Sequence, residues 1–270
     1  MNKVLLSFMF LWFTGCQKTS KYELQPEIEK DFSASGRYHN HFLNSGLKKM
    51  KDIGGYVDVN TLIEASSRFM ISNPKLITNP ILKFSDMQWY GTGVNLLEHK
   101  QQIEAGIDLM ATRDKGFLNE IFEIVEQHFS DKKLLKPALI LLKKKIESIT
   151  IPSFEKNKYI NTISIAYYSS NYWTDFYGFA NFSDATASRI SSPPIDIIVQ
   201  ADLFGYVSGH NMIMNTLEPH CQQDPDCLNR HTAWANCNAI NNSYIYSSTY
   251  STPNYPATPI MHTSTSCLSD

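Results

Sequence analysis

The chain has 270 residues, of which 43% are hydrophobic and 19% are charged, a balance typical of a globular protein rather than a disordered one. Its formal net charge of −2 argues against a general nucleic-acid-binding protein, because such proteins usually carry a strongly basic face. The length suffices for one large domain or two smaller ones.

The N-terminal segment has the pattern of an export signal. Lys3 supplies a positive charge, and an apolar run from Val4 to Phe13 follows it, interrupted only by Ser7. This run is too short to cross a bilayer, which takes about 20 residues. A charged start followed by a short apolar run and small residues is typical of a cleaved signal peptide, which we predict over residues 1–15.

The segment Phe13-Thr14-Gly15-Cys16 resembles the lipobox of bacterial lipoproteins, in which the cysteine is lipidated and becomes the first mature residue. The resemblance implies that Cys16 carries acyl chains that hold the protein at a membrane. Gln17 stands where lipoproteins of the inner membrane tend to have aspartate, so the resemblance favours the outer membrane, on either its periplasmic or its surface side. The alternative is a buried N-terminal helix with an incidental cysteine.

Charge is unevenly distributed along the rest of the chain. Most lysines and glutamates precede residue 160, whereas the later part is rich in Ser, Thr, Asn and Tyr. This shift predicts a tether over residues 16–35, a charged helical region over 36–160 and an aromatic, polar helical region over 161–270. The last two regions form either two subdomains or a single domain.

Helical signals dominate the charged region. Apolar residues recur at helical spacing in several segments, most clearly at Phe117, Ile121 and Val125. The predicted helices cover residues 60–72, 95–113, 115–129 and 132–149. Residues 79–94 are predicted to form a short extended piece or a loop, because glycines interrupt them. The fold class is therefore predicted as mainly α, a multi-helix assembly.

The next predicted helix covers residues 164–182 and is rich in aromatic residues. Tyr168, Tyr172 and Phe176 recur at a spacing of four, and Trp173 lies beside them. One interpretation is a helix buried among others, with hydroxyl groups reaching the surface. The other is an exposed surface that binds a glycan, a peptide or a protein partner, because Tyr and Trp are enriched at binding hot spots.

A further helix is predicted over residues 193–217. Ala201, Gly205 and Gly209 form a stripe of small residues that would let a neighbouring helix approach closely. We interpret the segment as a core helix, because its polar residues argue against a lipid-spanning one. The pattern Ala-Asp-x-x-Gly-x-x-x-Gly resembles one in uncharacterised exported lipoproteins of Bacteroidota, a resemblance that implies no activity. A membrane-active helix with a glycine stripe is the alternative.

Four cysteines remain after Cys16, an even number that suits disulfides in an exported chain: Cys221, Cys227, Cys237 and Cys267. Three connectivities are possible. We favour Cys221–Cys227 and Cys237–Cys267, which would brace the Tyr- and Ser-rich C-terminal part and its polar tail. A zinc site that adds His220 or His231 is the alternative, but the cysteine spacing is unlike that of structural zinc sites.

The remaining candidates for chemistry are Asp202, His210, His220 and His231. No Gly-x-Ser-x-Gly or His-Glu-x-x-His motif accompanies them, so we assign no catalytic residue and expect no metal or cofactor. The sequence favours a lipid-anchored cell-envelope protein with a non-enzymatic role in binding, its partners being the membrane and an unidentified protein or glycan. A secreted hydrolase without a recognisable motif is the second hypothesis, and a membrane-active protein is the third.

Overall fold

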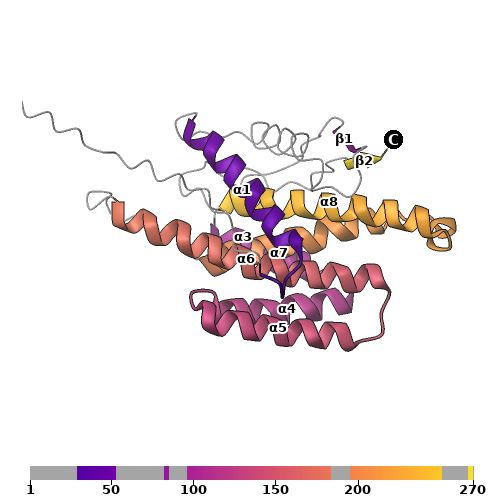
Figure 1. The fold of residues 1–270 in the computed structure, drawn as a ribbon, viewed down its shortest axis with the longest axis horizontal. Helices are drawn as coiled ribbons and strands as arrows, with labels where there is room; N and C mark the ends of the chain where they lie inside the picture. The colour runs from indigo at the N-terminus through magenta and orange to yellow at the C-terminus, as the bar shows by residue number, and fades with distance from the viewer. Residues whose placement is uncertain (1–28, 53–81, 85–95, 184–194, 251–266, 270) are drawn as a thin grey trace, which may run out of the picture.

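A computed structural model describes residues 29–52, 82–84, 96–183, 195–250 and 267–269, and its architecture is mainly helical as predicted (Figure 1). The described part contains seven α-helices, one short 3-10 helix and two short strands. In chain order these elements are α1 Ala34–Asp52, β1 Leu82–Phe84, α3 Leu96–Asp108, α4 Thr112–His128, α5 Lys132–Ser148, α6 Ser153–Ser183, α7 Ile195–Met214, η2 Pro219–Gln222, α8 Pro225–Tyr250 and β2 Cys267–Ser269.

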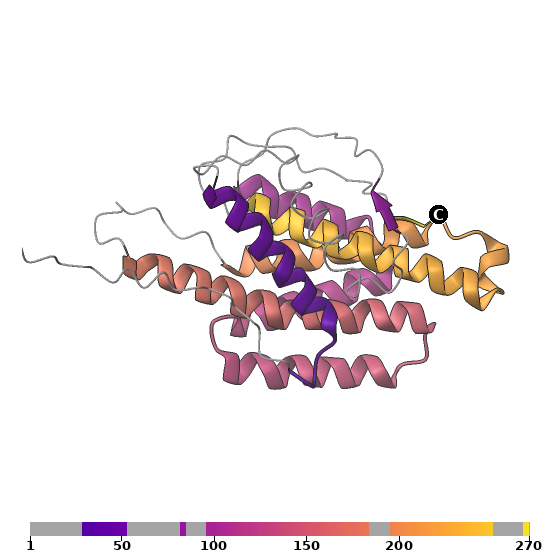
Figure 2. The same cartoon turned by 45° about the horizontal axis from the view of Figure 1, so that its top comes forward.

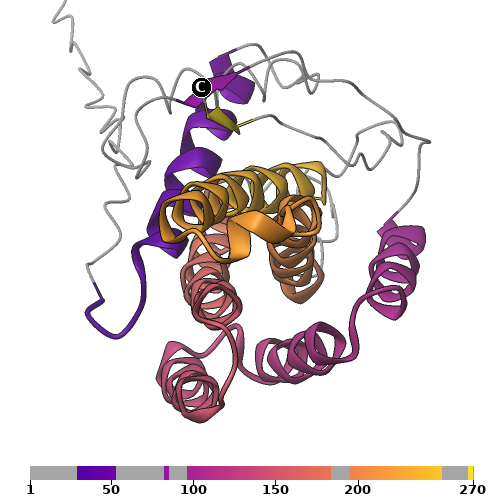
Figure 3. The same cartoon turned by 90° about the vertical axis from the view of Figure 1, so that its right-hand side faces the viewer.

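The helices α6, α7 and α8 form the centre of the molecule. Viewed end-on, α6 and α7 lie beneath α8, and the helices α5, α4 and α3 form an arc around the other side of the pair (Figure 3). Helix α1 crosses α6 and α8 obliquely on the remaining side (Figure 2). The core therefore lies between α6 and α7, with every other described helix covering part of it.

The helices α4 and α5 form where the apolar spacing predicts them. Phe117, Ile121 and Val125 are buried along one side of α4. Helix α5 begins after Asp131, whose side chain accepts a hydrogen bond of 2.9 Å from the backbone N–H of Lys133. This contact satisfies one of the backbone donors that a helix start leaves open. Local sequence thus determines these two helices. The predicted helix over residues 60–72 lies outside the described residues.

Helix α7 confirms the prediction of a core helix. Ala201, Gly205 and Gly209 are all buried, and α7 makes its most extensive contacts with α8. A helix that is apolar on all sides is stable only when other elements surround it. Among the residues that the structure describes, no helix combines enough length with enough apolar character to cross a bilayer.

The aromatic helix is buried rather than exposed. Tyr168, Tyr172 and Trp173 retain 3%, 4% and 0% of their accessible surface, so the interpretation as an exposed binding surface is wrong for these three residues. The physical reason is that α1 and α7 cover this part of α6: Asn40 bonds to the carbonyl of Tyr168, and Asp202 to the indole of Trp173. The side chain of Phe176 lies outside the described residues.

Two boundaries drawn from the sequence can be located in the structure. Helix α6 begins at Ser153 and runs through the compositional shift at residues 160 and 161, so that shift falls within one helix. The last residues of the predicted tether contact the fold, because Glu29 pairs with Lys136 on α5 at 2.5 Å. Composition changes within α6 because residues 162–170 are buried by other helices, whereas residues 153–157 reach the surface.

The C-terminal part contains one of the two favoured disulfides. Cys221 and Cys227 are bonded, with Cα atoms 5.1 Å apart, and cysteines in a disulfide cannot serve as thiolate ligands of zinc. The side chains of Cys237 and Cys267 lie outside the described residues, so their pairing stays a prediction. The backbone at Cys267 pairs with Phe84 in the antiparallel ladder of β1 and β2.

Helix α8 begins immediately inside this disulfide loop. The Asp224 carboxylate accepts hydrogen bonds from the backbone N–H groups of Asp226 at 2.9 Å and Cys227 at 3.3 Å. Pro225 occupies the first helical position, where its missing N–H has no effect on the helix. The Asp-Pro-Asp segment is therefore a helix start rather than a solvated turn.

Candidate functional site

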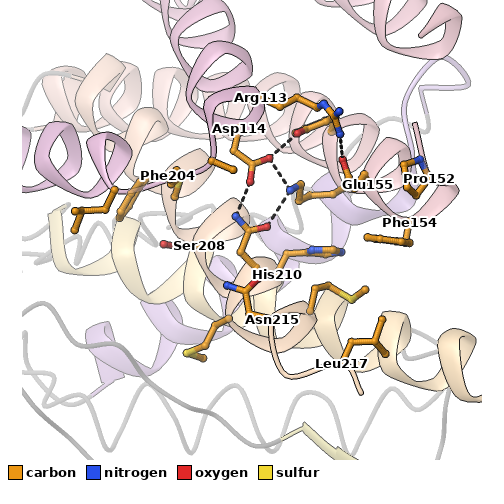
Figure 4. A pocket seen from close by; sticks show the side chains of 18 of the residues that line it. Arg113, Asp114, Pro152, Phe154, Glu155, Phe204, Ser208, His210, Asn215 and Leu217 are labelled. Atoms are coloured by element: carbon orange, nitrogen blue, oxygen red, sulfur yellow. Dashed lines mark hydrogen bonds and ion pairs between the residues drawn. The ribbon is translucent and has the colours of Figure 1, made fainter. Parts of the chain in front are cut away.

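A cleft of about 1420 Å³ opens at one end of the helical assembly (Figure 4). It lies where the turn between α3 and α4, the start of α6, the end of α7 and the start of α8 come together. A cleft of this size exceeds the range of about 300–1,000 Å³ that is usual for small-ligand sites, and such sites combine apolar walls with a few polar groups.

The first polar group of the cleft is the carboxylate of Asp114, in the first turn of α4. It accepts hydrogen bonds from Lys158 Nζ at 2.6 Å, from the Tyr159 hydroxyl at 2.5 Å and from Asn211 Nδ2 at 2.7 Å. Lys158 Nζ also donates to Asn211 Oδ1 at 2.9 Å, which closes the network. This cluster of four residues, from α4, α6 and α7, is called the Asp114 cluster below.

The electrostatics of the Asp114 cluster keep it charged and internally balanced. Burial alone would raise the pKa of Asp114, but the Lys158 ammonium and the three hydrogen bonds together hold that pKa below its ordinary value. Burial and the neighbouring Asp114 carboxylate raise the pKa of Tyr159, so its hydroxyl remains a donor. A buried ion pair of this kind is stable because hydrogen bonds satisfy both partners.

A second ion pair lies beside this cluster. Arg113 on α4 contacts Glu155 on α6, and both residues line the cleft. Figure 4 shows this pair near the Asp114 cluster. The two pairs give the cleft equal numbers of positive and negative groups, each joined to a group of opposite sign.

His210 on α7 is a buried polar residue of the cleft that lacks hydrogen-bond partners. Its side chain is 1% exposed, and neither ring nitrogen has a hydrogen-bond partner among the described residues. Burial, followed by the nearby Lys158 charge, lowers the pKa of His210 to about 3, so the ring is neutral at pH 7. A neutral imidazole offers one N–H donor and one acceptor nitrogen. Buried polar atoms without partners are rare in native proteins and mark sites that bind water, an ion or a ligand.

Apolar residues form the walls of the cleft, several of them methionines: Met110, Phe154, Met212, Met214, Leu217 and Leu228. Methionine side chains are unbranched and polarisable, and they adapt to apolar ligands of different shape. Leu109, at the edge of the cleft, is 90% exposed. Phe204 and Gly106 lie in direct contact within the wall, and a Cβ atom at Gly106 would overlap the Phe204 ring.

The structure does not bring together the four candidates that the sequence offered. Only His210 lines the cleft. His220 is exposed and lies 3.1 Å from the Glu218 carboxylate, while His231 Nε2 lies 2.8 Å from the carbonyl oxygen of Ile213. Asp202 is fully buried elsewhere in the core. These four residues therefore do not form a single group in the structure.

Asp202 instead lies in a buried network, called the Asp202 network below. Its carboxylate accepts hydrogen bonds from His39 Nε2 at 2.8 Å, from the Ser169 hydroxyl and from Trp173 Nε1 at 3.3 Å. These residue types resemble a hydrolytic triad, but the serine and the histidine bond to different oxygens of the carboxylate. All four side chains are fully buried, so the network joins α1, α6 and α7 rather than contacting a substrate.

The comparisons with known proteins give no functional assignment: no protein-family model, curated protein or solved structure matches the chain. The described residues contain no group of three or more His, Cys, Asp or Glu side chains able to hold a metal ion. The cleft is thus the feature of the described structure that indicates a function.

Proposed function

We propose that the protein is a lipid-anchored component of the cell envelope, and that its cleft binds a small ligand without transforming it. The observation that carries the binding role is His210, a buried residue lining a large cleft with both ring nitrogens unbonded among the described residues. The anchoring role is supported by the export signal and by the lipobox-like segment that ends at Cys16.

The groups in the cleft favour binding over hydrolysis. A general base works best when its pKa lies near the working pH, whereas the pKa of His210 is lowered to about 3. The Asp114 carboxylate already accepts three hydrogen bonds, so it has little capacity to take up a proton from water. Ser153 and Ser208 line the cleft, but neither is bonded to His210, so the described residues of the cleft do not include a serine activated by that histidine.

The first experiment tests anchoring. The full chain, expressed with its own N-terminal segment, should fractionate with membranes and incorporate labelled acyl chains. The variant Cys16→Ser should lose both properties, whereas Ser20→Ala, which leaves the lipobox-like segment intact, should behave as the wild type. Membrane association that survives in Cys16→Ser would contradict the anchoring role.

The second experiment tests the cleft. Diphenylhexatriene, an uncharged apolar dye whose fluorescence rises in apolar surroundings, should bind the protein with saturation. Leu228→Asp would introduce an unpaired charge in the apolar wall and should reduce dye binding at least about tenfold, because burying a charge without a partner is strongly unfavourable. Leu134→Asp, at an exposed position on α5 away from the cleft, is the matched control. Dye binding equal in both variants would contradict a ligand-binding cleft.

A further inference from the structure

The charges of the cleft constrain the kind of ligand that it accepts. Among the described residues, two cationic and two anionic side chains line it, and they form the pairs Arg113–Glu155 and Lys158–Asp114. Lys158 and Asp114 are 5% and 7% exposed, so each is held by its partner away from water. An ionised ligand group would lose its hydration at the base of the cleft without finding an unpaired opposite charge. The base of the cleft therefore favours an uncharged ligand group.

The hydrogen-bonding capacity of His210 further limits which ligand group can bind at the base of the cleft. Its neutral ring presents one donor and one acceptor, and both lack partners among the residues described. A hydroxyl or an amide group can accept from the ring N–H or donate to the other nitrogen, so it can bond to whichever nitrogen it reaches. A carboxylate can only accept, and an alkylammonium can only donate. Uncharged groups that both donate and accept are thus the best match to His210.

The walls indicate what the rest of the ligand is like. Methionine, leucine and phenylalanine side chains line the cleft above its polar base, and these side chains contact apolar surface favourably. The cleft volume of about 1420 Å³ leaves room for an extended apolar body. The three methionines, Met110, Met212 and Met214, can adjust to chains of different shape.

We infer that the ligand is a neutral amphiphile, with a hydroxyl or amide head group that hydrogen-bonds to His210 and an apolar body that lies along the methionine-rich walls. This inference rests on the proposed function, since it names the class of ligand for the same cleft. His210 is the residue that determines specificity for the head group, and the Asp114 cluster excludes charged heads by offering no free charge.

The test is a displacement experiment on the full chain at neutral pH. Bound diphenylhexatriene is displaced by a straight-chain alcohol, a carboxylate and an alkylammonium of equal chain length, each below its aggregation limit. The alcohol should displace the dye at a concentration about five- to tenfold lower than either charged compound, the ratio expected from one buried hydrogen bond.

The variant His210→Phe keeps the ring volume and removes both nitrogens. It should still bind the dye, but the advantage of the alcohol should fall about five- to tenfold. His210→Gln, which retains a donor and an acceptor, should preserve part of the preference for the alcohol. His220→Phe alters an exposed histidine that does not line the cleft and should match the wild type.

The outcomes separate this inference from the proposed function. If the wild type binds neither the dye nor any of the three amphiphiles, the proposed binding function fails. If the dye binds but all three amphiphiles displace it equally, the cleft binds ligands and the inference about their class is wrong. If the alcohol is preferred equally by the wild type and by His210→Phe, the imidazole serves a buried water or the packing alone, which also overturns the inference.

Discussion

The Asp202 network and the Asp114 cluster are built alike, but the histidine of the first and the histidine beside the second differ in their hydrogen bonds. Each has a buried carboxylate that accepts three hydrogen bonds and joins three helices, α1, α6 and α7 in one case and α4, α6 and α7 in the other. In the first, His39 is bonded at both nitrogens. Beside the second, His210 is bonded at neither among the described residues.

The two histidines also differ in how their neighbours orient them. The Asn40 amide donates to the Tyr168 carbonyl at 2.9 Å, which orients its oxygen toward His39 Nδ1 at 3.2 Å. The other nitrogen, Nε2, lies 2.8 Å from the Asp202 carboxylate, so both ring nitrogens of His39 have a hydrogen-bonding partner. The ring of His210 is neutral at pH 7 and has none among the described residues. The His39 ring is therefore held by its neighbours on both sides, whereas the His210 ring is not.

The largest expected effect comes from exchanging each histidine for phenylalanine. His39→Phe leaves the buried Asp202 carboxylate without one of its three hydrogen-bond partners and should lower the free energy of unfolding by about 3 kcal/mol, because an unsatisfied buried acid group is costly. His210→Phe removes two unbonded polar atoms from the interior and should change stability by less than about 1 kcal/mol, or increase it. Urea denaturation of the three proteins measures both values. Equal losses in the two variants would show that the histidines have the same role.

The next effect concerns packing beside the Asp202 network. A Cβ atom at Gly36 would overlap the backbone carbonyl of Ser164, where α1 approaches α6. The Gly36 N–H also donates to Ser164 Oγ at 3.2 Å, so α1 cannot move away without losing a bond. Gly36→Ala should therefore destabilise the protein by about 1–3 kcal/mol. A thermal melt that matches the wild type would show that α1 is not held closely against α6.

The pH dependence of stability should report the lowered pKa of His210. The pKa of His210 falls from 6.5 in the unfolded chain to about 3 in the folded protein, so below pH 6.5 the unfolded state binds the extra proton. Stability should then fall as the pH falls from 6.5 toward 3, by about 1.4 kcal/mol per pH unit relative to His210→Phe. Lys158, Asp114 and His231 are the charged or titratable groups that act on this ring.

Urea denaturation of the wild type and of His210→Phe between pH 4.5 and pH 8 provides the measurement. The lowered pKa of Asp114 acts in a different window, because a depressed carboxyl pKa contributes stability above about pH 4 and loses it only at lower pH. The lowered pKa of His41 is common to both proteins and cancels in their difference. Parallel curves for the two proteins would show that folding leaves the pKa of His210 unchanged.

The smallest effect is expected at Gly116, on α4 near the Asp114 cluster. A Cβ atom there would meet nothing within 4 Å. Gly116→Ala should increase the free energy of unfolding by about 0.5–1 kcal/mol, because alanine favours the helix more than glycine does. Gly36→Ala should therefore lower the free energy of unfolding, whereas Gly116→Ala should raise it. A loss of stability would mean that α4 is packed more tightly than the structure shows.

Features with a local cause were predictable from the sequence. The apolar stripe through Phe117, Ile121 and Val125 determines α4, and the apolar character of residues 193–217 determines the burial of α7, because both depend on side chains within one segment. Helix α8 was missed: Asp224 and Pro225 form a good helix start, but the Ser, Asn and Tyr residues that follow resemble a polar tail.

The cleft could not have been predicted in the same way. Asp114, Lys158 and Asn211 lie 44 and 53 residues apart along the chain, and each is a polar residue that sequence alone would place at the surface. Their meeting depends on how α4, α6 and α7 pack. His210 was a candidate by residue type, but nothing near it in the sequence distinguishes it from His220, since the difference is burial.

The position of α1 in the chain has a consequence for the order in which the protein folds. The bonds that hold α1 in place reach across 128 residues to Tyr168 and across 163 residues to Asp202. The ladder of β1 and β2 likewise joins Leu82 to Ser269, almost at the C-terminus. Contacts so distant along the chain form late and slowly, because the intervening loop must close first. The N-terminal helix therefore has no stable docking site until α6 and α7 have been synthesised, and the nascent chain stays open until then.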